Sequence, residues 1–293
     1  MPELPEIETV KNVIEPQIQG IAIEKVTVNR PEVIAHPGAE EFCRDLTGQI
    51  VSHMGRRGKF LLIWLKNNSC IVLHLRMTGC LLLTPADILQ ERDPLTDGPK
   101  DLSYGVPAGH THVVLSLNDG RELRFSDTRR FGRFWLLKEG ERDTYSGIGK
   151  LGIEPFDGEL TAQYLRSRLG KRRKAVKGCL LDQTIIAGIG NIYSDEILFA
   201  AGIYPGRPAN SLEMADWERL AAVIPERLLF FIEKNKISPE EYLQSKGRDY
   251  RNTPFLKVYG HAGEPCPKCA SVLKRMVVGG RGSVYCPGCQ REF

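Results

Sequence analysis

The residues best suited to chemistry stand at the start of the chain, which reads MPELPEIET. Methionine is usually removed when a small residue follows it, so we expect the mature chain to begin at Pro2 with a free secondary amine. A terminal amine has a reference pKa of about 8, against about 10.4 for lysine, and is unprotonated far more often at neutral pH. Its adduct with carbon stays cationic, because the nitrogen has no proton to lose. Pro2 is therefore a candidate nucleophile for covalent catalysis.

Two carboxylates accompany this amine. Glu3 adjoins Pro2, and Glu6 follows one helical turn later. Glu3 could donate or accept a proton. Glu6 could position substrate or tune the pKa of Glu3, because two nearby carboxylates resist joint ionisation. The structural alternative is that both simply suit the positive end of a helix. The sequence assigns proton transfer first to Glu3 and a supporting role to Glu6.

Four cysteines near the C-terminus have the spacing of a metal site. Cys266 and Cys269 form one Cys-x-x-Cys pair, and Cys286 and Cys289 form a second. Such pairs fit tetrahedral zinc, and four thiolates with no open position indicate a structural ion rather than a catalytic one. Disulfide bonds are the alternative, disfavoured in a cytosolic protein. We expect one structural Zn²⁺.

The segment between the two cysteine pairs predicts a hairpin. Its strands are expected at 272–278 and 283–285, with Arg281 in the Gly-Gly-Arg-Gly turn that joins them. A rigid finger with one cation at its tip suits contact with phosphate, and a merely soluble turn is the alternative.

A glycine-rich turn, Gly188-Ile189-Gly190-Asn191, separates two helical patterns. Asn191 is placed to cap the helix that begins at Ile192. Helix N-termini attract anions, so the turn could clamp a DNA phosphate, although a structural helix–helix turn is the alternative. Basic residues also cluster at 55–59, 129–130 and 171–174. If these clusters converge in space they would form a phosphate-binding surface; otherwise they are ordinary solvated charge.

The elements that must position these residues fall into a β-rich half and a helical half. Apolar residues at three- and four-residue spacing predict a helix over 5–19, ended by Gly20. Strand-like runs follow between 21 and 137, interrupted by a polar segment at 85–110 that we expect outside the sheets. After Gly158 the patterns become helical, at 160–169, 175–188, 191–202 and 211–235. This order predicts an α+β fold with separate domains.

Composition agrees with an ordinary globular protein. The 293 residues are 42% hydrophobic and 26% charged, with a net charge of +4. The longest apolar runs, such as 60–65, are too short for a membrane span, and the acidic start does not resemble a signal peptide. We therefore expect a cytosolic protein without a membrane partner. The remaining cysteines are expected in the core; they are Cys43, Cys70, Cys80 and Cys179.

Five motifs occur in order along nearly the whole chain. They are the Pro-Glu start, HLRMTG at 74–79, DTRRFG at 127–132, GIGNIYSDEILFAAGI at 188–203 and the cysteine quartet. Together they make the sequence resemble the bacterial formamidopyrimidine-DNA glycosylase family. The resemblance implies an N-terminal β-sandwich domain with an N-terminal helix at 1–140, a helix–two-turn–helix domain at 150–245 and a zinc finger at 256–293.

The resemblance also implies a function in base excision repair. A bifunctional glycosylase and AP lyase would excise oxidised purines, namely 8-oxoguanine and formamidopyrimidines, and cleave the strand by β,δ-elimination through a Pro2 iminium. Lys59 would contact phosphate and assist elimination, and Arg281 would help in the final elimination. The implied partner is double-stranded damaged DNA, bound by a monomer in the bacterial cytosol or nucleoid. No nucleotide-cofactor motif is present.

The resemblance assigns further residues to DNA. Those matched to phosphate or backbone contacts are His74, His110, Arg172 and Asn191. Three others match the side chains that fill the gap left by a flipped nucleotide. Met can adapt to the void, Phe can wedge between base pairs and Arg can hydrogen-bond the orphaned cytosine, which are the roles implied for Met77, Phe131 and Arg129. Without the resemblance, Met77 and Phe131 would be read as core residues, because each flanks a strand.

Two alternative functions fit parts of the sequence, and the chain differs from the family pattern at several positions. An endonuclease VIII-like enzyme for oxidised pyrimidines usually starts PEGPEI, whereas this chain starts PELPEI after Met1. A non-catalytic damaged-DNA-binding protein would not need Pro2, Glu3 and Lys59 intact. His261 stands where relatives often carry arginine, and 85–110 is longer than the corresponding family loop. The 241–255 stretch matches the variable loop thought to cover the flipped base, and it does not reveal which lesion is preferred.

Overall fold

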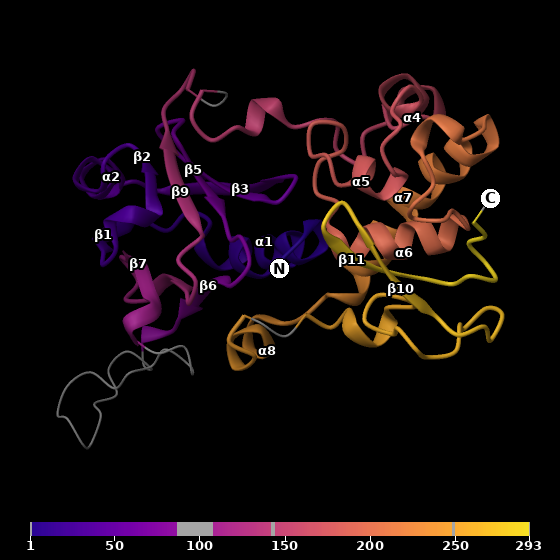
Figure 1. Cartoon of the computed structure of the whole chain (residues 1–293). Helices are drawn as coiled ribbons and strands as arrows, with labels where there is room; N and C mark the ends of the chain where they lie inside the picture. The colour runs from indigo at the N-terminus through magenta and orange to yellow at the C-terminus, as the bar shows by residue number, and fades with distance from the viewer. Residues whose placement is uncertain (1, 87–107, 142–143, 248–249, 293) are drawn as a thin grey trace. The chain divides into compact units, whose positions relative to one another are not determined.

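The computed structural model describes residues 2–86, 108–141, 144–247 and 250–292. It divides into two compact units, which Figure 1 colours along the chain and which are treated separately below. The N-terminal unit comprises Met1–Pro2, Glu6–Gly149 and Lys236–Tyr250, and the C-terminal unit comprises Glu3–Pro5, Lys150–Asn235 and Arg251–Phe293. The division differs from the predicted boundaries, because 236–245 packs with the N-terminal unit.

The N-terminal unit is a β-sandwich with a helix. One sheet has the order β1-β7-β8-β6 and the other β2-β9-β5-β4-β3. The strands are β1 (Ile23–Val28), β2 (Ile34–His36), β3 (Val51–Arg57), β4 (Phe60–Leu65), β5 (Cys70–His74), β6 (Gly79–Thr84), β7 (Thr111–Leu117), β8 (Glu122–Asp127) and β9 (Arg133–Leu137). The helices are α1 (Leu4–Ile18) and α2 (Ala39–Leu46). Helix α1 ends as predicted, before Gly20 at φ +83°.

A single apolar core joins both sheets and α1. The face of α1 that carries Ile7, Val10 and Ile14 is almost fully buried in this core. Strand β4 alternates between buried and half-buried residues, so one side faces the core. The opposite side of its sheet carries a smaller apolar cluster around Trp135. The predicted helix and sandwich are therefore confirmed, and their packing follows from the two periodicities.

Strands β2, β3 and β6 and helix α2 of this unit were not predicted from the sequence. Strand β2 has three residues, and α2 buries only Phe42 and Leu46 among its eight. Strand β3 carries the polar sequence VSHMGRR, which hides its alternation. Strand β6 is buried at every position and so has no alternation to detect. Most of the 85–110 segment lies outside the described residues, apart from its two ends.

The chain returns to the N-terminal unit after the helical region. Helix α8 (Pro239–Gln244) begins with a capping box formed by Ser238 and Glu241. Tyr242 Oη donates to Leu81 O at 3.1 Å, and Cys80 Sγ donates to Lys246 O at 3.1 Å. These bonds attach the first half of the 241–255 stretch to β6. Cys80 is buried as predicted, but its thiol also holds this loop.

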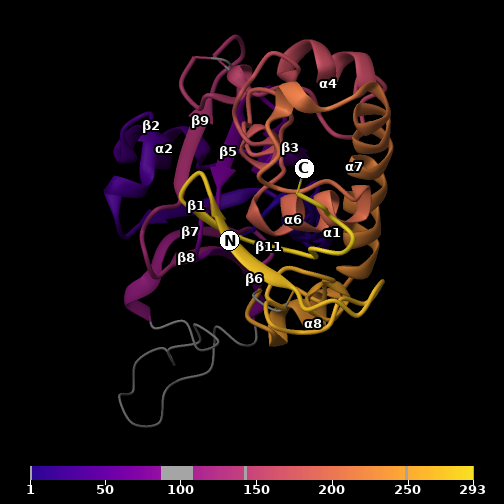
Figure 2. The same cartoon turned by 45° about the vertical axis from the view of Figure 1, so that its right-hand side comes forward.

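The C-terminal unit combines helices with a two-stranded hairpin. Its helices are α4 (Ala162–Leu169), α5 (Val176–Leu180), α6 (Asn191–Ala201) and α7 (Met214–Lys234), and its strands are β10 (Lys274–Val278) and β11 (Arg281–Tyr285). The α5–α6 turn spans 181–190, as expected for a helix–two-turn–helix fold. Helix α6 packs against β11, and the two lie side by side in Figures 1 and 2. Short 3₁₀ turns complete the two units at Pro31–Val33, Ala108–His110, Ile148–Lys150, Ala209–Ser211 and Thr253–Phe255.

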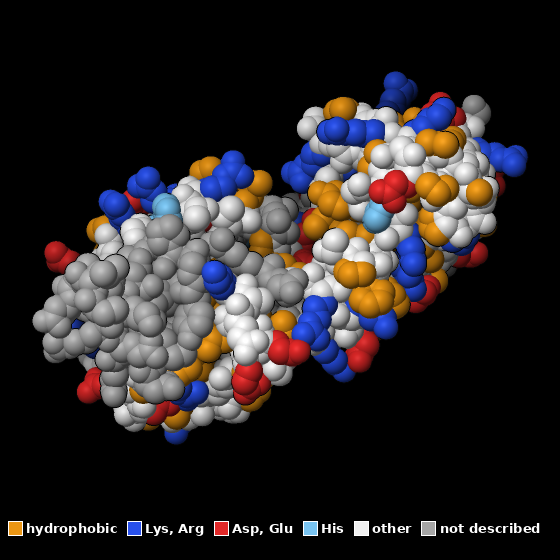
Figure 3. All heavy atoms as spheres, turned by 90° about the horizontal axis from the view of Figure 1, so that it is seen from below, with side chains coloured by type: hydrophobic (Ala, Val, Ile, Leu, Met, Phe, Trp, Pro, Cys, Tyr) orange, Lys and Arg blue, Asp and Glu red, His pale blue; other side chains and the backbone are white. Residues whose placement is uncertain are grey.

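The surface carries both signs of charge. On the face shown in Figure 3, Lys and Arg side chains are interspersed with Asp and Glu side chains. Within the described ranges, no helix has the length and apolar character needed to cross a bilayer.

Candidate active site and DNA interface

Glu3 is seated on the N-terminus of helix α6. Its Oε1 accepts the backbone N–H of Ile192 at 3.0 Å, and its Oε2 accepts that of Tyr193 at 3.3 Å. Only 1% of Glu3 is exposed. Both the two donors and the positive end of the helix favour the ionised carboxylate. A residue near the start of the chain thus caps a helix that begins almost 190 residues later.

Two glycines of the α5–α6 turn leave the space that the side chains of Glu3 and Leu4 occupy. A Cβ on Gly190 would lie 2.2 Å from Cδ and from Oε1 of Glu3. A Cβ on Gly188 would lie 2.5 Å from a methyl of Leu4, and Gly188 also has φ +93°. Leu4 N donates to Gly188 O at 3.2 Å. The turn therefore needs both glycines for steric reasons.

Gln183 holds the same turn in shape. Its Nε2 donates to Leu181 O at 3.1 Å and to Ile189 O at 2.8 Å, while its Oε1 accepts Gly188 N–H at 2.9 Å. One amide thereby closes the backbone that receives Glu3. Gln183 was not predicted from the sequence, because a glutamine within a helical pattern does not by itself indicate a structural role.

Asn191 does not cap α6, contrary to the prediction. Gly190 occupies the N-cap position without a side-chain cap, and Asn191 is the first helical residue. Its Nδ2 instead donates to Gly282 O in the zinc hairpin at 3.1 Å. Glu3, rather than Asn191, caps helix α6. The Asn191 side chain instead connects the turn to the hairpin.

A buried ion pair fixes the hairpin to the helices. Lys177 Nζ lies 2.7 Å from Asp195 Oδ1, and both side chains are fully buried. Lys177 also donates to Gly282 O at 3.1 Å. Asp195 accepts Ser283 Oγ at 2.6 Å and Val284 N–H at 3.0 Å. These bonds hold the residues that directly follow Arg281, whose own side chain is exposed at the start of β11.

The next residue of α6 holds the segment before the zinc finger. Glu196 accepts the backbone N–H groups of Lys257, Val258 and Tyr259 at 2.9–3.0 Å. Burial raises its pKa, although these three hydrogen bonds oppose the shift. The sequence could have indicated both acids, because Asp195 and Glu196 precede the apolar run at 197–201 in the same helix.

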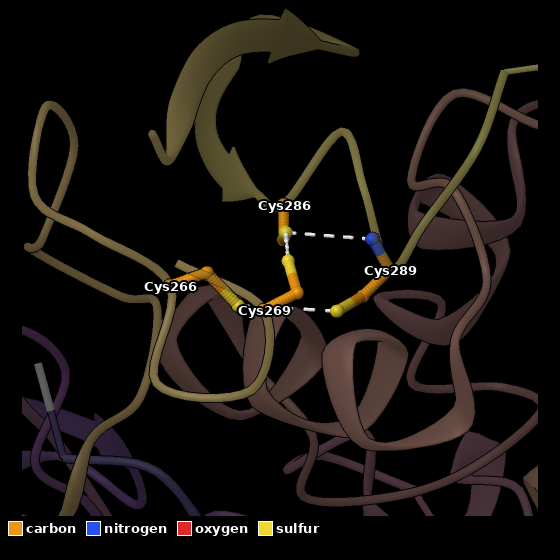
Figure 4. Close-up of side chains that lie close together, drawn as sticks. All are labelled: Cys266, Cys269, Cys286 and Cys289. Atoms are coloured by element: carbon orange, nitrogen blue, oxygen red, sulfur yellow. Dashed lines mark hydrogen bonds between the residues drawn. The ribbon is translucent and has the colours of Figure 1, made fainter. Parts of the chain in front are cut away.

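The four cysteines of the predicted metal site lie together. Figure 4 shows their sulfur atoms close to one another, and all four lie within 4.8 Å of one another. The Sγ–Sγ distances are 3.4 Å for Cys269–Cys286 and 3.9 Å for Cys266–Cys289, near the edge of about 3.8 Å for a zinc tetrahedron with Zn–S bonds of about 2.3 Å. The cysteines are not disulfide-bonded. They form the zinc site, closed by four thiolates and therefore structural.

Two predicted residues, Lys59 and His74, lie at one end of the N-terminal sandwich, here called the loop end. This end comprises the β3–β4 turn and the loops that follow β5 and β8. Phe60 pairs with His74, and His74 pairs with Arg133. Lys59 immediately precedes the first of these residues and is 8% exposed. Arg56 Nε donates to Glu8 Oε2 at 2.7 Å, which places the β3–β4 hairpin against the first half of α1. Lys59 and His74 therefore both lie at the loop end.

His74 is buried and neutral. Its pKa is lowered to about 3 by burial first, and then by the positive charges of Arg76 and Lys59. Its Nδ1 accepts Arg76 N–H at 3.0 Å, so the neutral ring carries its proton on Nε2. His74 can therefore offer a phosphate one neutral N–H and no positive charge.

The predicted void-filling residues are exposed rather than in the core. Met77 is 45% exposed and Phe131 is 48% exposed, which is high for large apolar side chains. Arg129 connects them: its Nη1 lies 3.3 Å from Met77 Sδ, and its Cζ lies 5.2 Å from the Phe131 ring centroid. The alternative that Met77 and Phe131 are core residues is wrong.

The remaining predicted residues are spread over both units. His110 is half-buried at the end of the 3₁₀ turn before β7, whose first residue pairs with Ser126 near the loop end. Glu6 is 2% exposed in the first turn of α1. Arg172 is 37% exposed and lies 2.9 Å from Asp182. His261 lies 2.8 Å from Glu264.

Three family domains match the chain in order. Residues 1–134 match the formamidopyrimidine-DNA glycosylase N-terminal domain, 151–241 the formamidopyrimidine-DNA glycosylase H2TH domain, and 263–291 the zinc finger found in FPG and IleRS. The formamidopyrimidine-DNA glycosylase of Moorella thermoacetica is 44% identical over 276 residues, which is 94% of either chain. That of Bacillus anthracis is 41% identical over 99% of either chain.

Solved structures agree with these matches. Lactococcus lactis Fpg in complex with abasic-site DNA superposes with a TM-score of 0.85 at 31% identity, over 99% of this chain and 100% of that one. The same enzyme with Fapy-dG-containing DNA gives a TM-score of 0.84 at 31% identity, over the same shares of the two chains. The chain therefore belongs to the formamidopyrimidine-DNA glycosylase family of DNA-repair enzymes, as its motifs predicted.

Proposed function

We propose that this chain is a bifunctional glycosylase and AP lyase that excises 8-oxoguanine and formamidopyrimidines from duplex DNA. The observation that carries the proposal is the position of Glu3: a buried carboxylate, bound by two N–H donors of α6, directly follows the candidate nucleophile Pro2 in the chain. A carboxylate held in this way is a fixed proton acceptor. The proposal requires that Met1 is removed.

The first chemical step joins the enzyme to the sugar. The Pro2 nitrogen attacks C1′, and the bond from C1′ to the damaged base breaks with its electron pair leaving on the base. Glu3 accepts the proton that the amine releases and passes it to the ring oxygen O4′, which opens the sugar. The product is an iminium that cannot lose a proton from nitrogen, so it remains an electron sink.

The second stage cleaves the strand. Loss of a proton from C2′ expels the 3′ phosphate, and loss of a proton from C4′ then expels the 5′ phosphate; water finally hydrolyses the iminium and frees Pro2. We assign Lys59 and Arg281 to the departing phosphates, whose negative charge each cation would stabilise. Glu6 would tune Glu3. The buried ion pair beside Gly282 supports a fixed position for Arg281.

DNA binding would rest mainly on phosphate contacts, which makes it salt-dependent and nearly indifferent to sequence. His74, His110, Arg172 and Asn191 are the proposed contacts. Met77 and Phe131 would fill the gap left by the flipped nucleotide, and Arg129 would bind the orphaned cytosine. The exposure of all three side chains supports this assignment. One relative, Lactococcus lactis Fpg, was solved with abasic-site DNA and with Fapy-dG DNA, which supports formamidopyrimidines as substrates.

The experiment is borohydride trapping with product analysis. Duplexes contain 8-oxoguanine, a formamidopyrimidine, an oxidised pyrimidine or an abasic site, each opposite the base that would pair with the undamaged nucleotide. We expect a trapped adduct, strand ends that carry phosphate on both sides of the gap, and faster excision of the purine lesions. A variant with Gly inserted before Pro2 is the matched control and should lose the adduct.

Each rival has its own outcome. Preferred excision of the oxidised pyrimidine would indicate the endonuclease VIII-like alternative. Tight binding without an adduct on any duplex would indicate a non-catalytic damage-binding protein. An adduct undiminished by the added Gly would overturn the role of Pro2.

A further inference from the structure

Two loops connect the sheets at the loop end and carry all three exposed void-filling side chains. The first loop, 75–78, leads from β5 to β6, and the second, 128–132, leads from β8 to β9. Gly79, which opens β6, pairs with Asp127, which closes β8. The two loops, here called the wedge loops, therefore start from one point of the sandwich.

A single buried carboxylate joins the wedge loops. Asp127 is 0% exposed. Its Oδ1 accepts the hydroxyl of Thr78 from the first loop and, at 3.1 Å, the N–H of Arg129 from the second. Its Oδ2 accepts Gly132 N–H at 2.8 Å. Arg129 N also lies 3.3 Å from Thr78 Oγ1. Asp127 thus binds both ends of the second loop and the last residue of the first.

The loops adopt a backbone that needs such support. Arg76 in the first loop has φ +58° and Arg130 in the second has φ +57°, and neither is glycine. Left-handed conformations of this kind are disfavoured for most residues and persist where surrounding contacts enforce them. A Cβ on Gly132 would lie 2.3 Å from the Phe125 ring, so the second loop is also held sterically.

We propose that Asp127, acting with Thr78, is a positioning residue that sets Arg129 for the orphaned base and so determines the preference for cytosine opposite the lesion. Arg129 is bound at its own backbone N–H, and its side chain contacts Met77 and Phe131. The three side chains are therefore held together, which lowers the cost of ordering them for recognition. The inference rests on the proposed function, from which the void-filling roles come.

The test compares Thr78→Val with Thr78→Ser. Valine keeps the size of threonine but removes the hydroxyl that Asp127 accepts, whereas serine keeps it. Single-turnover excision of 8-oxoguanine is measured opposite cytosine and opposite adenine, with Arg129→Ala as the reference for complete loss of the contact. We expect the excision rate of Thr78→Val to fall about tenfold opposite cytosine and less opposite adenine, since a hydrogen bond to the buried carboxylate of Asp127 is removed. Thr78→Ser should restore the wild-type ratio.

Single-stranded abasic DNA separates positioning from folding. It has no orphaned base and no stacked gap, so Thr78→Val should be trapped on it at the wild-type rate. Equal losses on single-stranded and duplex substrates, or an unchanged cytosine-to-adenine ratio, would overturn the inference. Asp127→Asn, which keeps the size of the side chain but presents an amide to one N–H donor, is the second variant and should shift the ratio in the same direction. Wild-type protein that excises nothing would refute the proposed function instead.

Discussion

At the loop end of the sandwich, the buried carboxylate of Asp127 is bound by a hydroxyl and two backbone N–H groups within a few residues of two adjoining strands. On helix α6, the buried carboxylate of Asp195 also meets the ammonium of Lys177 and ties helix to hairpin. Both regions thus hold exposed candidate site residues through a buried acid. They differ in what the acid must join.

The difference follows from the length of chain between the joined parts. The wedge loops extend from strands that are already paired, so local hydrogen bonds suffice to fix them. The hairpin carrying Arg281 lies some 90 residues beyond α6 along the chain. A charged pair with extra hydrogen bonds gives that distant contact a defined register, at the cost of desolvating two charges. Long-range positioning should therefore be more sensitive to substitution than local positioning.

The largest effect is expected from Gly190→Ala, because this change disrupts the long-range contact between Glu3 and the N-terminus of α6. The new Cβ would lie 2.2 Å from the Glu3 carboxylate and displace it from α6. We expect 8-oxoguanine excision to fall by about 100- to 10,000-fold, the usual contribution of a proton-transfer group. Single-turnover kinetics measures it. Gly158→Ala, where a Cβ meets nothing within 4 Å, is the matched control. Wild-type kinetics for Gly190→Ala would show that Glu3 does not need this seat.

The next effect compares the two regions directly through stability. Lys177→Met leaves Asp195 buried without its ion-pair partner and should lower the free energy of unfolding by about 3–5 kcal/mol. Thr78→Val removes one hydrogen bond from Asp127 and should cost only about 1–3 kcal/mol. Urea denaturation of the two variants beside wild type measures both. Equal costs would break the distinction between long-range and local positioning.

Loss of a zinc ligand tests how far Arg281 depends on its hairpin. Cys286→Ser should release the finger and weaken binding to duplex DNA by at least about tenfold, because a fixed phosphate contact is lost. Trapping on single-stranded abasic DNA should persist, since Pro2 is unchanged. Salt-matched titrations with Cys43→Ser as the control would measure this. Retained affinity in Cys286→Ser would argue against a binding role for the finger.

The smallest effect concerns pH at the loop end. The pKa of His74 is about 3 in the folded protein, below the reference value of 6.5. The unfolded state therefore binds a proton that the folded state does not between these values, and stability falls as pH drops through 6.5. The slope from this group is at most about 1.4 kcal/mol per pH unit. His74→Gln should remove that slope in urea denaturation between pH 7.5 and 5.5. His53→Gln, at an exposed site, should leave it unchanged.

Much of the fold could be predicted because its periodicities are plain. The helix of 5–19 and the strands at 60–65 and 122–127 were evident, and the cysteine spacing predicted zinc directly. Strands β3 and β6 escaped detection, since one is polar and the other is buried on both faces. The return of 236–250 to the N-terminal unit depends on long-range contacts such as Tyr242 with Leu81, which no local pattern records.

The candidate site shows the same limit. Motifs predicted roles for Pro2, Glu3 and Arg129, but they did not predict the residues that contact Glu3 and Arg129. Gln183 acts through bonds to backbone atoms of its own turn, and Lys177 acts through a bond to Gly282 O, far along the chain. Asn191 was assigned a capping role that Glu3 fills. Residue type and spacing predict which group does chemistry. They do not predict which buried partner sets its place.

The most direct test of the central claim is the identity of the trapped atom. Wild-type protein is incubated with a duplex containing 8-oxoguanine opposite cytosine, reduced with borohydride, digested and sequenced by mass spectrometry. We expect a peptide that begins at Pro2, without Met1, and carries the sugar fragment on the proline nitrogen. A sugar fragment on Lys59 or on any other lysine, with an unmodified Pro2, would contradict it.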